Sequence, residues 1–173
     1  MKNRMTAFAL GSALAIVGLA PVASHGEQAR CAPATAGQKT PAEPVATPEE
    51  FKARVIRQTD LPMVELVPGS NSRLRAGEQS MISFLKMDKG SYFAPHRHHQ
   101  EQIMIVLEGY CDEIIEGKRY RVQKGDVIIL PSNIEHGAYI RDQDVQVIDV
   151  FGEVREDYMI KLLQVMATLN KKK

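Results

Sequence analysis

The 173-residue chain contains no tryptophan, only two cysteines and few aromatic residues, which make up 6% of the sequence. The cysteines, Cys31 and Cys111, are far apart and form no Cys-x-x-Cys pair, so we expect no structural disulfide, zinc-thiolate site or dithiol redox motif. Neither sign of charge dominates, because 22 basic residues stand against 21 acidic ones. The sequence therefore predicts no basic surface for nucleic acid and leaves an ordinary globular domain as the starting point.

The longest apolar stretch lies at the N-terminus. Lys2 and Arg4 precede TAFALGSALAIVGLA, and small residues continue through Ser24. This stretch is too short for a transmembrane helix, which needs about 20 apolar residues, whereas a basic start and a small-residue end are typical of a secretory signal peptide. We predict a signal peptide over residues 1–24 and a periplasmic or secreted mature protein that is not held at a membrane. The alternatives are a membrane-tethered N-terminus and a wrongly assigned start of the chain.

The rest of the chain changes character near residue 50. Residues 25–50 are rich in Ala, Pro and Thr and offer little apolar surface to bury, which is typical of a mobile linker. From Phe51 onward, short apolar and β-branched runs alternate with connectors rich in Gly, Pro, Asn and Asp. Many short strands at regular spacing predict a β-sandwich or β-barrel, so residues 51–173 are expected to form one all-β domain.

The end of this domain has a different periodicity, with apolar residues at helical spacing. Acidic residues precede this segment and three lysines follow it, which suits the helix dipole. We predict a C-terminal amphipathic helix packed on the barrel or on a partner subunit. Its apolar stripe consists of Met159, Leu162, Leu163, Met166 and Leu169.

Three of the chain's five histidines lie in the segment PHRHHQEQ, residues 95–102. In an extended strand alternate side chains share a face, so His96, His98 and Gln102 point one way. His99 and Glu101 point the other way. Two histidines two positions apart can bind one metal ion through their imidazole nitrogens, but a tight site needs a third ligand from elsewhere.

His136, in the segment GDVIILPSNIEHGAYI, is the candidate for that third ligand. Together the two histidine segments resemble the two sequence motifs of the cupins, a family of small β-barrels. The first motif reads Gly, five residues, His, one residue, His, three or four residues, Glu, six residues, Gly. Its positions are filled here by Gly90, His96, His98, Gln102 and Gly109, with Gln102 where the family usually has Glu.

The second cupin motif reads Gly, five residues, Pro, one residue, Gly, two residues, His, three residues, Asn. Its positions are filled here by Gly125, Pro131, Asn133, His136 and Ile140. Two positions therefore depart from the family pattern. Asn133 replaces a glycine, which is a mild change because asparagine tolerates a left-handed backbone.

The resemblance covers roughly the last two-thirds of the chain. It implies a jelly-roll-like cupin β-barrel of short antiparallel strands, with one divalent transition metal ion bound by His96, His98, Gln102 and His136. Imidazole and amide ligands accept Zn, Ni, Mn or Fe(II), and the sequence does not choose between them. Glu101 is the alternative fourth ligand if a bulge turns it inward. A barrel that has lost its metal and keeps the histidines as packing residues is the alternative to a metal site.

Neutral imidazoles and an amide leave the charge of a metal ion uncompensated, which favours an anionic ligand or substrate in its open positions. This ligand set and the tail VFGEVREDYM resemble small single-domain cupins of the pectin-degradation branch, which open unsaturated uronates to linear keto-uronates. The resemblance implies a Lewis-acid enzyme that isomerises or opens the ring of a small anionic sugar acid. A cupin dioxygenase or lyase and a non-catalytic binding module stay open, because fold alone does not fix function.

Two further residues are candidates for proton transfer. Asp149 interrupts the apolar run VQVIDVF, where an inward carboxyl group would have a raised pKa. The alternative for Asp149 is a carboxylate bonded to a neighbouring strand or turned to solvent. Tyr92 lies an even number of positions from His96, although Pro95 makes that parity unreliable. Three arginines either hold the anionic substrate at the mouth of the barrel or form an ordinary solvated face: Arg119, Arg121 and Arg141. Exposed apolar strands and the terminal helix are compatible with a homodimer.

Overall fold

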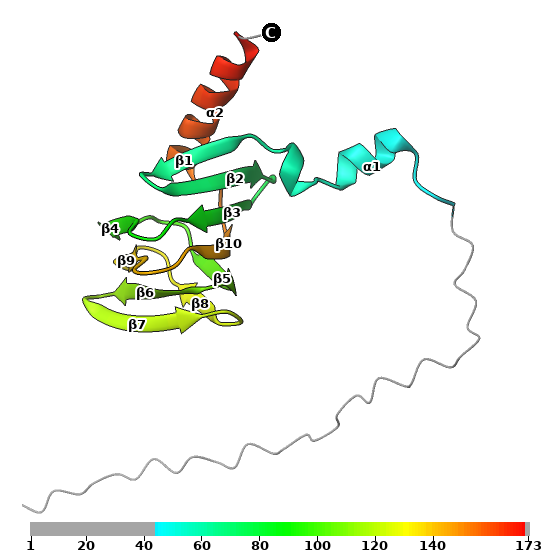
Figure 1. Cartoon of the computed structure of the whole chain (residues 1–173). Helices are drawn as coiled ribbons and strands as arrows, with labels where there is room; N and C mark the ends of the chain where they lie inside the picture. The colour runs from blue at the N-terminus through cyan, green and yellow to red at the C-terminus, as the bar shows by residue number, and fades with distance from the viewer. Residues whose placement is uncertain (1–43, 172–173) are drawn as a thin grey trace, which may run out of the picture. The chain divides into compact units, whose positions relative to one another are not determined.

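The computed structural model describes residues 44–171 (Figure 1). The chain divides into two units, Met1–Pro44 and Val45–Lys173. The predicted signal peptide and most of the predicted linker therefore lie outside the described residues. No helix within the described range is long and apolar enough to cross a membrane.

The first described element is a short helix, α1 (Pro48–Arg54), which begins inside the segment predicted as linker. Its start is set by a capping box, because the Glu50 amide donates to the Thr47 hydroxyl and the Thr47 amide donates to the Glu50 carboxylate. Pro48 occupies the first turn, where a missing amide hydrogen costs nothing. None of its residues is buried, so capping and not packing defines this helix. A single 3₁₀ turn, η1 (Gln58–Asp60), leads from it to the sheets.

Two antiparallel sheets build the domain, which confirms the predicted all-β architecture. The larger sheet has the order β1-β2-β3-β10-β5-β8, and the smaller has the order β4-β9-β6-β7. The strands of the larger sheet are β1 (Met63–Val67), β2 (Ser70–Ala76), β3 (Met81–Met87), β10 (Val145–Phe151), β5 (Gln102–Glu108) and β8 (Val127–Leu130). Those of the smaller sheet are β4 (Tyr92–His96), β9 (His136–Tyr139), β6 (Tyr110–Ile115) and β7 (Lys118–Gln123).

The core lies between the two sheets, and strand alternation decides which side chains enter it. In β10, for example, Val145, Val147 and Phe151 are almost completely buried, whereas Gln146 is exposed. Asp149 shares the inward face of that strand and is only 2% exposed. The same alternation that builds the apolar core therefore carries a carboxyl group into it.

The connection before β9 contains the asparagine that replaces a motif glycine. Asn133 has φ +63°, the left-handed conformation that we expected asparagine to tolerate at this position. Its amide donates to the His98 carbonyl at 2.8 Å. This turn therefore ties the segment before His136 to the segment that holds His98.

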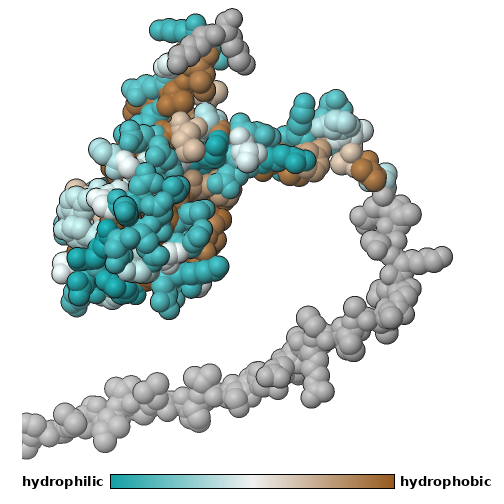
Figure 2. Space-filling view, in the orientation of Figure 1, coloured by the Kyte–Doolittle hydropathy of each residue, from teal (hydrophilic) through white to brown (hydrophobic). Residues whose placement is uncertain are grey.

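The predicted C-terminal helix is present as α2 (Glu156–Asn170). Tyr158 and Leu162 are buried against the core, and the Lys161 ammonium donates to the Leu66 carbonyl of β1 at 2.9 Å. Part of the predicted apolar stripe faces away from the barrel, and Figure 2 shows hydrophobic surface along this helix. The exposed apolar residues of α2 are Ile160, Leu163, Met166 and Leu169.

Candidate metal centre

The structure brings His96, His98 and His136 together at one end of the barrel. His96 ends β4, His136 begins β9, and the two are register partners in the smaller sheet. His98 lies in the loop after β4, and Gln102 begins β5 in the larger sheet. A ring nitrogen from each of the three histidines lies within 4.8 Å of the others. Both sheets therefore contribute to the group of residues that the sequence predicted as metal ligands.

The protons on the three imidazoles are placed by backbone carbonyls. The Nδ1 atoms of His96, His98 and His136 lie 2.9, 2.9 and 3.0 Å from the carbonyl oxygens of residues 94, 100 and 134. A carbonyl only accepts hydrogen bonds, so each Nδ1 carries the proton and each Nε2 presents a lone pair. This is the arrangement in which carbonyls orient metal-binding histidines.

The lone pairs converge on one point. The Nε2 of His98 lies 3.2 Å from the Nε2 of His136 and 3.2 Å from the Oε1 of Gln102. With these proton positions all three atoms are acceptors, so a bound cation would make their close approach favourable. Three imidazole nitrogens, which are borderline ligands, and one amide oxygen, which is a hard ligand, fit a divalent transition metal ion.

Burial keeps the imidazoles of His98 and His136 neutral. It lowers the pKa of His98 to about 4, with further lowering from the charge of Arg155. Burial likewise lowers the pKa of His136 to about 4. Because a metal ion binds the deprotonated imidazole, these side chains need not lose a proton at neutral pH in order to coordinate one.

Asp149 orients the fourth candidate ligand. The Gln102 Nε2 donates to the Asp149 Oδ1 at 2.8 Å, which turns the Gln102 Oε1 toward His98. Burial raises the pKa of Asp149 to about 7, while hydrogen bonds from Gln102 and Ser83 and the charge of Arg155 act in the opposite direction. Asp149 therefore positions the amide of Gln102 and is also a carboxyl group able to exchange a proton near neutral pH.

Tyr92 lies away from this cluster. It stacks on Tyr139 with ring centroids 4.6 Å apart and is 43% exposed. The β4–β9 register shifts between Phe93 and His96, so the parity that linked Tyr92 to His96 is broken, and Phe93 lines the cavity instead. Gly137 permits this bulge, because a Cβ there would lie 2.6 Å from the Phe93 carbonyl oxygen. The alternative ligand, Glu101, is exposed to solvent.

A small cavity adjoins the histidine cluster. Its interior volume is about 40 Å³, enough for an ion and one or two water-sized ligands, and the space including its open mouth is about 370 Å³. Apolar side chains, including Met87, Phe93 and Met104, form much of its wall. The titratable residues lining it are His96, Glu113, His136, Asp149 and Tyr158.

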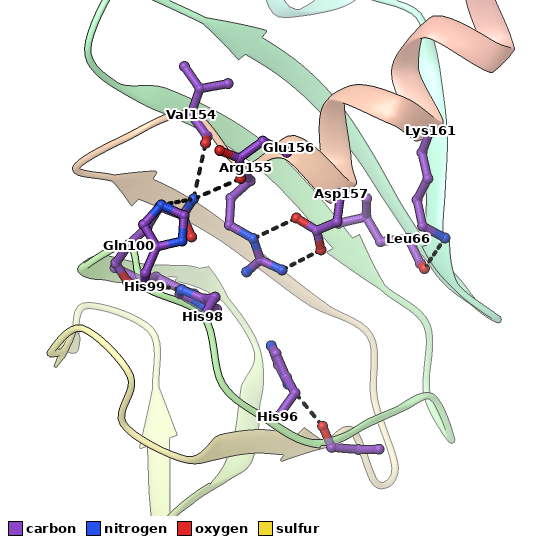
Figure 3. Close-up of polar contacts among 12 residues, drawn as sticks. Leu66, His96, His98, His99, Gln100, Val154, Arg155, Glu156, Asp157 and Lys161 are labelled. Carbon is purple, nitrogen blue, oxygen red and sulfur yellow. Dashed lines mark hydrogen bonds and ion pairs between the residues drawn. The ribbon is translucent and has the colours of Figure 1, made fainter.

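Arg155, which was not predicted from the sequence as a site residue, is a buried cation next to the histidines. Its Nε and Nη2 donate to the Asp157 carboxylate at 2.9 and 2.6 Å, and its guanidinium lies 4.3 Å from the Tyr158 ring centroid. Its Nη1 is buried and has no hydrogen-bond partner within residues 44–171. Figure 3 shows the free side of the guanidinium facing the histidines. Arg155 belongs to the segment VFGEVREDYM but lies in a loop, where strand parity does not predict which way a side chain points.

The three arginines considered as substrate-binding residues lie away from the cavity, on the outer face of the smaller sheet. They are Arg119, Arg121 and Arg141. Arg121 and Arg141 donate to the Asp112 carboxylate, and Arg119 lies 3.9 Å from it. Asp112 is only 1% exposed, and these hydrogen bonds lower its pKa to about 2 against the opposing effect of burial. These arginines pair with a carboxylate of the protein and do not line the cavity.

Replacing Asp112 by Asn should lower the free energy of unfolding at pH 7 by about 2 kcal/mol, because the pKa of this group is depressed by nearly two units in the folded state. A carboxyl group with a depressed pKa stabilises the folded state at pH values above its pKa in the unfolded chain, which is about 4. This stabilisation is lost as the pH falls toward 2. Denaturant unfolding at pH 7 and near pH 2 should therefore show the difference from wild type shrinking with acid. Asp88→Asn, in an exposed pair with Lys86, should cost under about 0.5 kcal/mol at either pH. A pH-independent loss in Asp112→Asn would contradict this assignment.

The fold and the clustered ligands define a cupin: residues 83–151 match the family described as Cupin domain. The matched region gives the chain a cupin domain, and the chain resembles the pectin-degradation branch of the cupin superfamily. It is 26% identical over 102 residues to the pectin degradation protein KdgF of Dickeya dadantii (strain 3937), a match that covers 58% of this chain and 93% of that protein.

Solved structures agree with this placement. KdgF from Halomonas sp. is 29% identical with a TM-score of 0.54, and the match covers 58% of this chain and 93% of that one. An RmlC-like cupin from Shewanella frigidimarina NCIMB 400 is 23% identical with a TM-score of 0.57, covering 61% and 95% of the two chains, and supports the fold alone.

Proposed function

We propose that this chain is an exported, metal-dependent cupin enzyme that opens the ring of an unsaturated uronate, a small anionic sugar acid. The observation that carries this proposal is the buried Nη1 of Arg155, which has no hydrogen-bond partner among residues 44–171 and lies beside three clustered histidines. A buried guanidinium donor next to a group of candidate metal ligands is suited to bind a carboxylate. Similarity to two KdgF proteins, one of them a pectin degradation protein, supports the same substrate class.

His96, His98 and His136 would hold one divalent ion, Zn, Ni, Mn or Fe(II), with Gln102 as the fourth ligand. Such an ion supplies Lewis acidity that polarises a carbonyl or carboxylate oxygen. The remaining roles belong to the chain itself. Arg155 is buried and does not line the cavity, so its guanidinium has to turn toward the histidines for Nη1 to bind the carboxylate of the uronate. Asp149 accepts the proton of the ring hydroxyl as the ring opens. Because the interior of the cavity has a volume of only about 40 Å³, only the reacting end of the uronate enters it, and the rest of the sugar lies in the mouth of the cavity.

The test is turnover of an unsaturated monouronate by the purified mature chain, followed by proton NMR as the cyclic form is lost. We expect turnover that a chelator abolishes and that one of the four metals restores. Arg155→Gln should raise KM about 10- to 100-fold, the cost of a lost charge-assisted hydrogen bond, with metal content unchanged. Arg155→Lys, which keeps the charge, should be affected less.

A chain that binds metal but leaves the uronate unchanged would be a binding module, not an isomerase. Oxygen consumption or cleavage of the carbon skeleton in the same assay would instead indicate the dioxygenase or lyase alternative. Each of these outcomes contradicts ring opening.

Export and self-association are further parts of the proposal. Cleavage near residue 24 and release to the periplasm or medium are checked by the mass of the mature protein in cell fractions. Dimerisation through the exposed apolar residues of α2 is supported by their location on one helix and is checked by the molar mass in solution.

A further inference from the structure

The cavity contains a second carboxyl group, that of Glu113, in addition to Asp149. Glu113 is 3% exposed and lies on β6 of the smaller sheet, whereas Asp149 lies on β10 of the larger one. Both line the cavity next to His96 and His136. The two carboxyl groups therefore approach the same space from different sheets.

Strand alternation places Glu113 inward. Its neighbour Asp112 points outward to the arginines, so Glu113 takes the opposite face of β6. Glu113 pairs in register with Ala138, another residue lining the cavity. Its side chain is held at the cavity by two neighbouring strands and is not part of a loop.

Glu113 has no cationic partner among residues 44–171. Its one hydrogen bond there is a weak one with the Cys111 thiol, at an Sγ–Oε1 distance of 4.0 Å. A buried carboxyl group without a cation is costly when ionised, which favours its acid form. Burial and the charge of Asp149 accordingly raise the pKa of Glu113 to about 8. The titratable groups beside it or around the cavity are Cys111, Asp149, His96, His136 and Tyr158.

We propose that Glu113 is the proton donor of this cavity and acts opposite Asp149 on the sugar acid. This inference rests on the proposed ring opening. Asp149 takes the proton of the ring hydroxyl, whose oxygen becomes the carbonyl oxygen as the ring C–O bond breaks. The electron pair of that bond passes to the ring oxygen, which takes the proton of Glu113. The sugar acid loses one proton to Asp149 and receives one from Glu113, so the open product has the same composition as the ring. Proton exchange with solvent then returns Asp149 to its carboxylate form and Glu113 to its acid form.

The experiment compares Glu113→Gln with the wild-type chain loaded with the active metal. An amide fills the same space but cannot donate a proton with comparable acidity, so kcat should fall about 10²- to 10⁴-fold. KM should stay within about threefold, and plasma emission should still find one metal ion per chain. The wild-type kcat should fall as the pH rises past about 8, because the acid form is then lost, and this alkaline decline should vanish in Glu113→Gln.

Two companion variants control for packing. Cys111→Ser keeps a buried donor beside Glu113, and its kcat should stay within about threefold of wild type. Glu113→Asp keeps the acid on a shorter side chain, so it should retain the alkaline decline at a reduced kcat. This second variant tests the proposal even if Glu113→Gln fails to fold.

Three results would overturn the inference. Wild-type kcat in Glu113→Gln would make Glu113 a packing residue while leaving the proposed ring opening intact. An unchanged alkaline decline in that variant would assign the pH dependence to another group. A wild-type chain that binds metal but does not open the uronate would overturn the proposed function itself, and the role of Glu113 with it.

Discussion

Replacing His136 by alanine should remove the metal and lower turnover by about 10³-fold or more, since a bound Lewis acid contributes several kcal/mol to the barrier. The imidazole is only 5% exposed, and its Nε2 lies 3.2 Å from that of His98. Without it, two histidines and an amide remain, too few for a tight transition-metal site. Plasma emission on the purified variant should find far less than one metal ion per chain.

The same segment of the chain provides a matched control for this loss. His99 follows His98 directly, but its Nε2 is 3.1 Å from the Glu153 carboxylate in an exposed pair. His99→Ala should therefore keep its metal and its turnover. Metal retained by His136→Ala, or lost equally from both variants, would show that the converging lone pairs do not form the binding site.

The group of histidines was predictable from the sequence, although the local argument for it was incomplete. Strand parity assumed one continuous strand through residues 96–102. Instead β4 ends at His96, and His98 belongs to a loop that returns to Gln102 at the start of β5. His96, His98 and Gln102 come together because β4, β5 and the loop between them meet at one place. The spacing of the sequence motif predicts this grouping, whereas strand parity does not. The same assumption failed for Tyr92, because a bulge at residues 94 and 95 reverses the faces of β4.

Residues that matter through long-range contacts were harder to predict. Asp112 and Glu113 are adjacent acids in the strand CDEIIE, and parity says only that they face opposite ways. Which one enters the cavity is decided by pairing with β7 and β9, which brings Arg121 opposite Asp112 and Ala138 opposite Glu113. Arg155 lies in a loop, and its burial follows from docking of α2, which no local pattern specifies.

Asp149 provides the second large expected effect, and two substitutions separate its two roles. Asp149→Asn keeps an oxygen that can accept from the Gln102 amide, so the ligand stays oriented, but it cannot take up a proton as a carboxylate does. We expect kcat to fall about 10²- to 10⁴-fold with metal content near one ion per chain. The measurement is turnover and plasma emission on the same preparation.

Asp149→Ala removes both roles, because the Gln102 amide loses the partner that turns its Oε1 toward His98. Loss of such an outer partner costs about 10- to 100-fold in metal affinity. A metal titration should therefore rank wild type close to Asp149→Asn and well above Asp149→Ala, whereas turnover at saturating metal should be low in both variants. If Asp149→Asn turned over the uronate like wild type, Asp149 would serve only to orient Gln102, and the proton would have to pass to another group in the cavity.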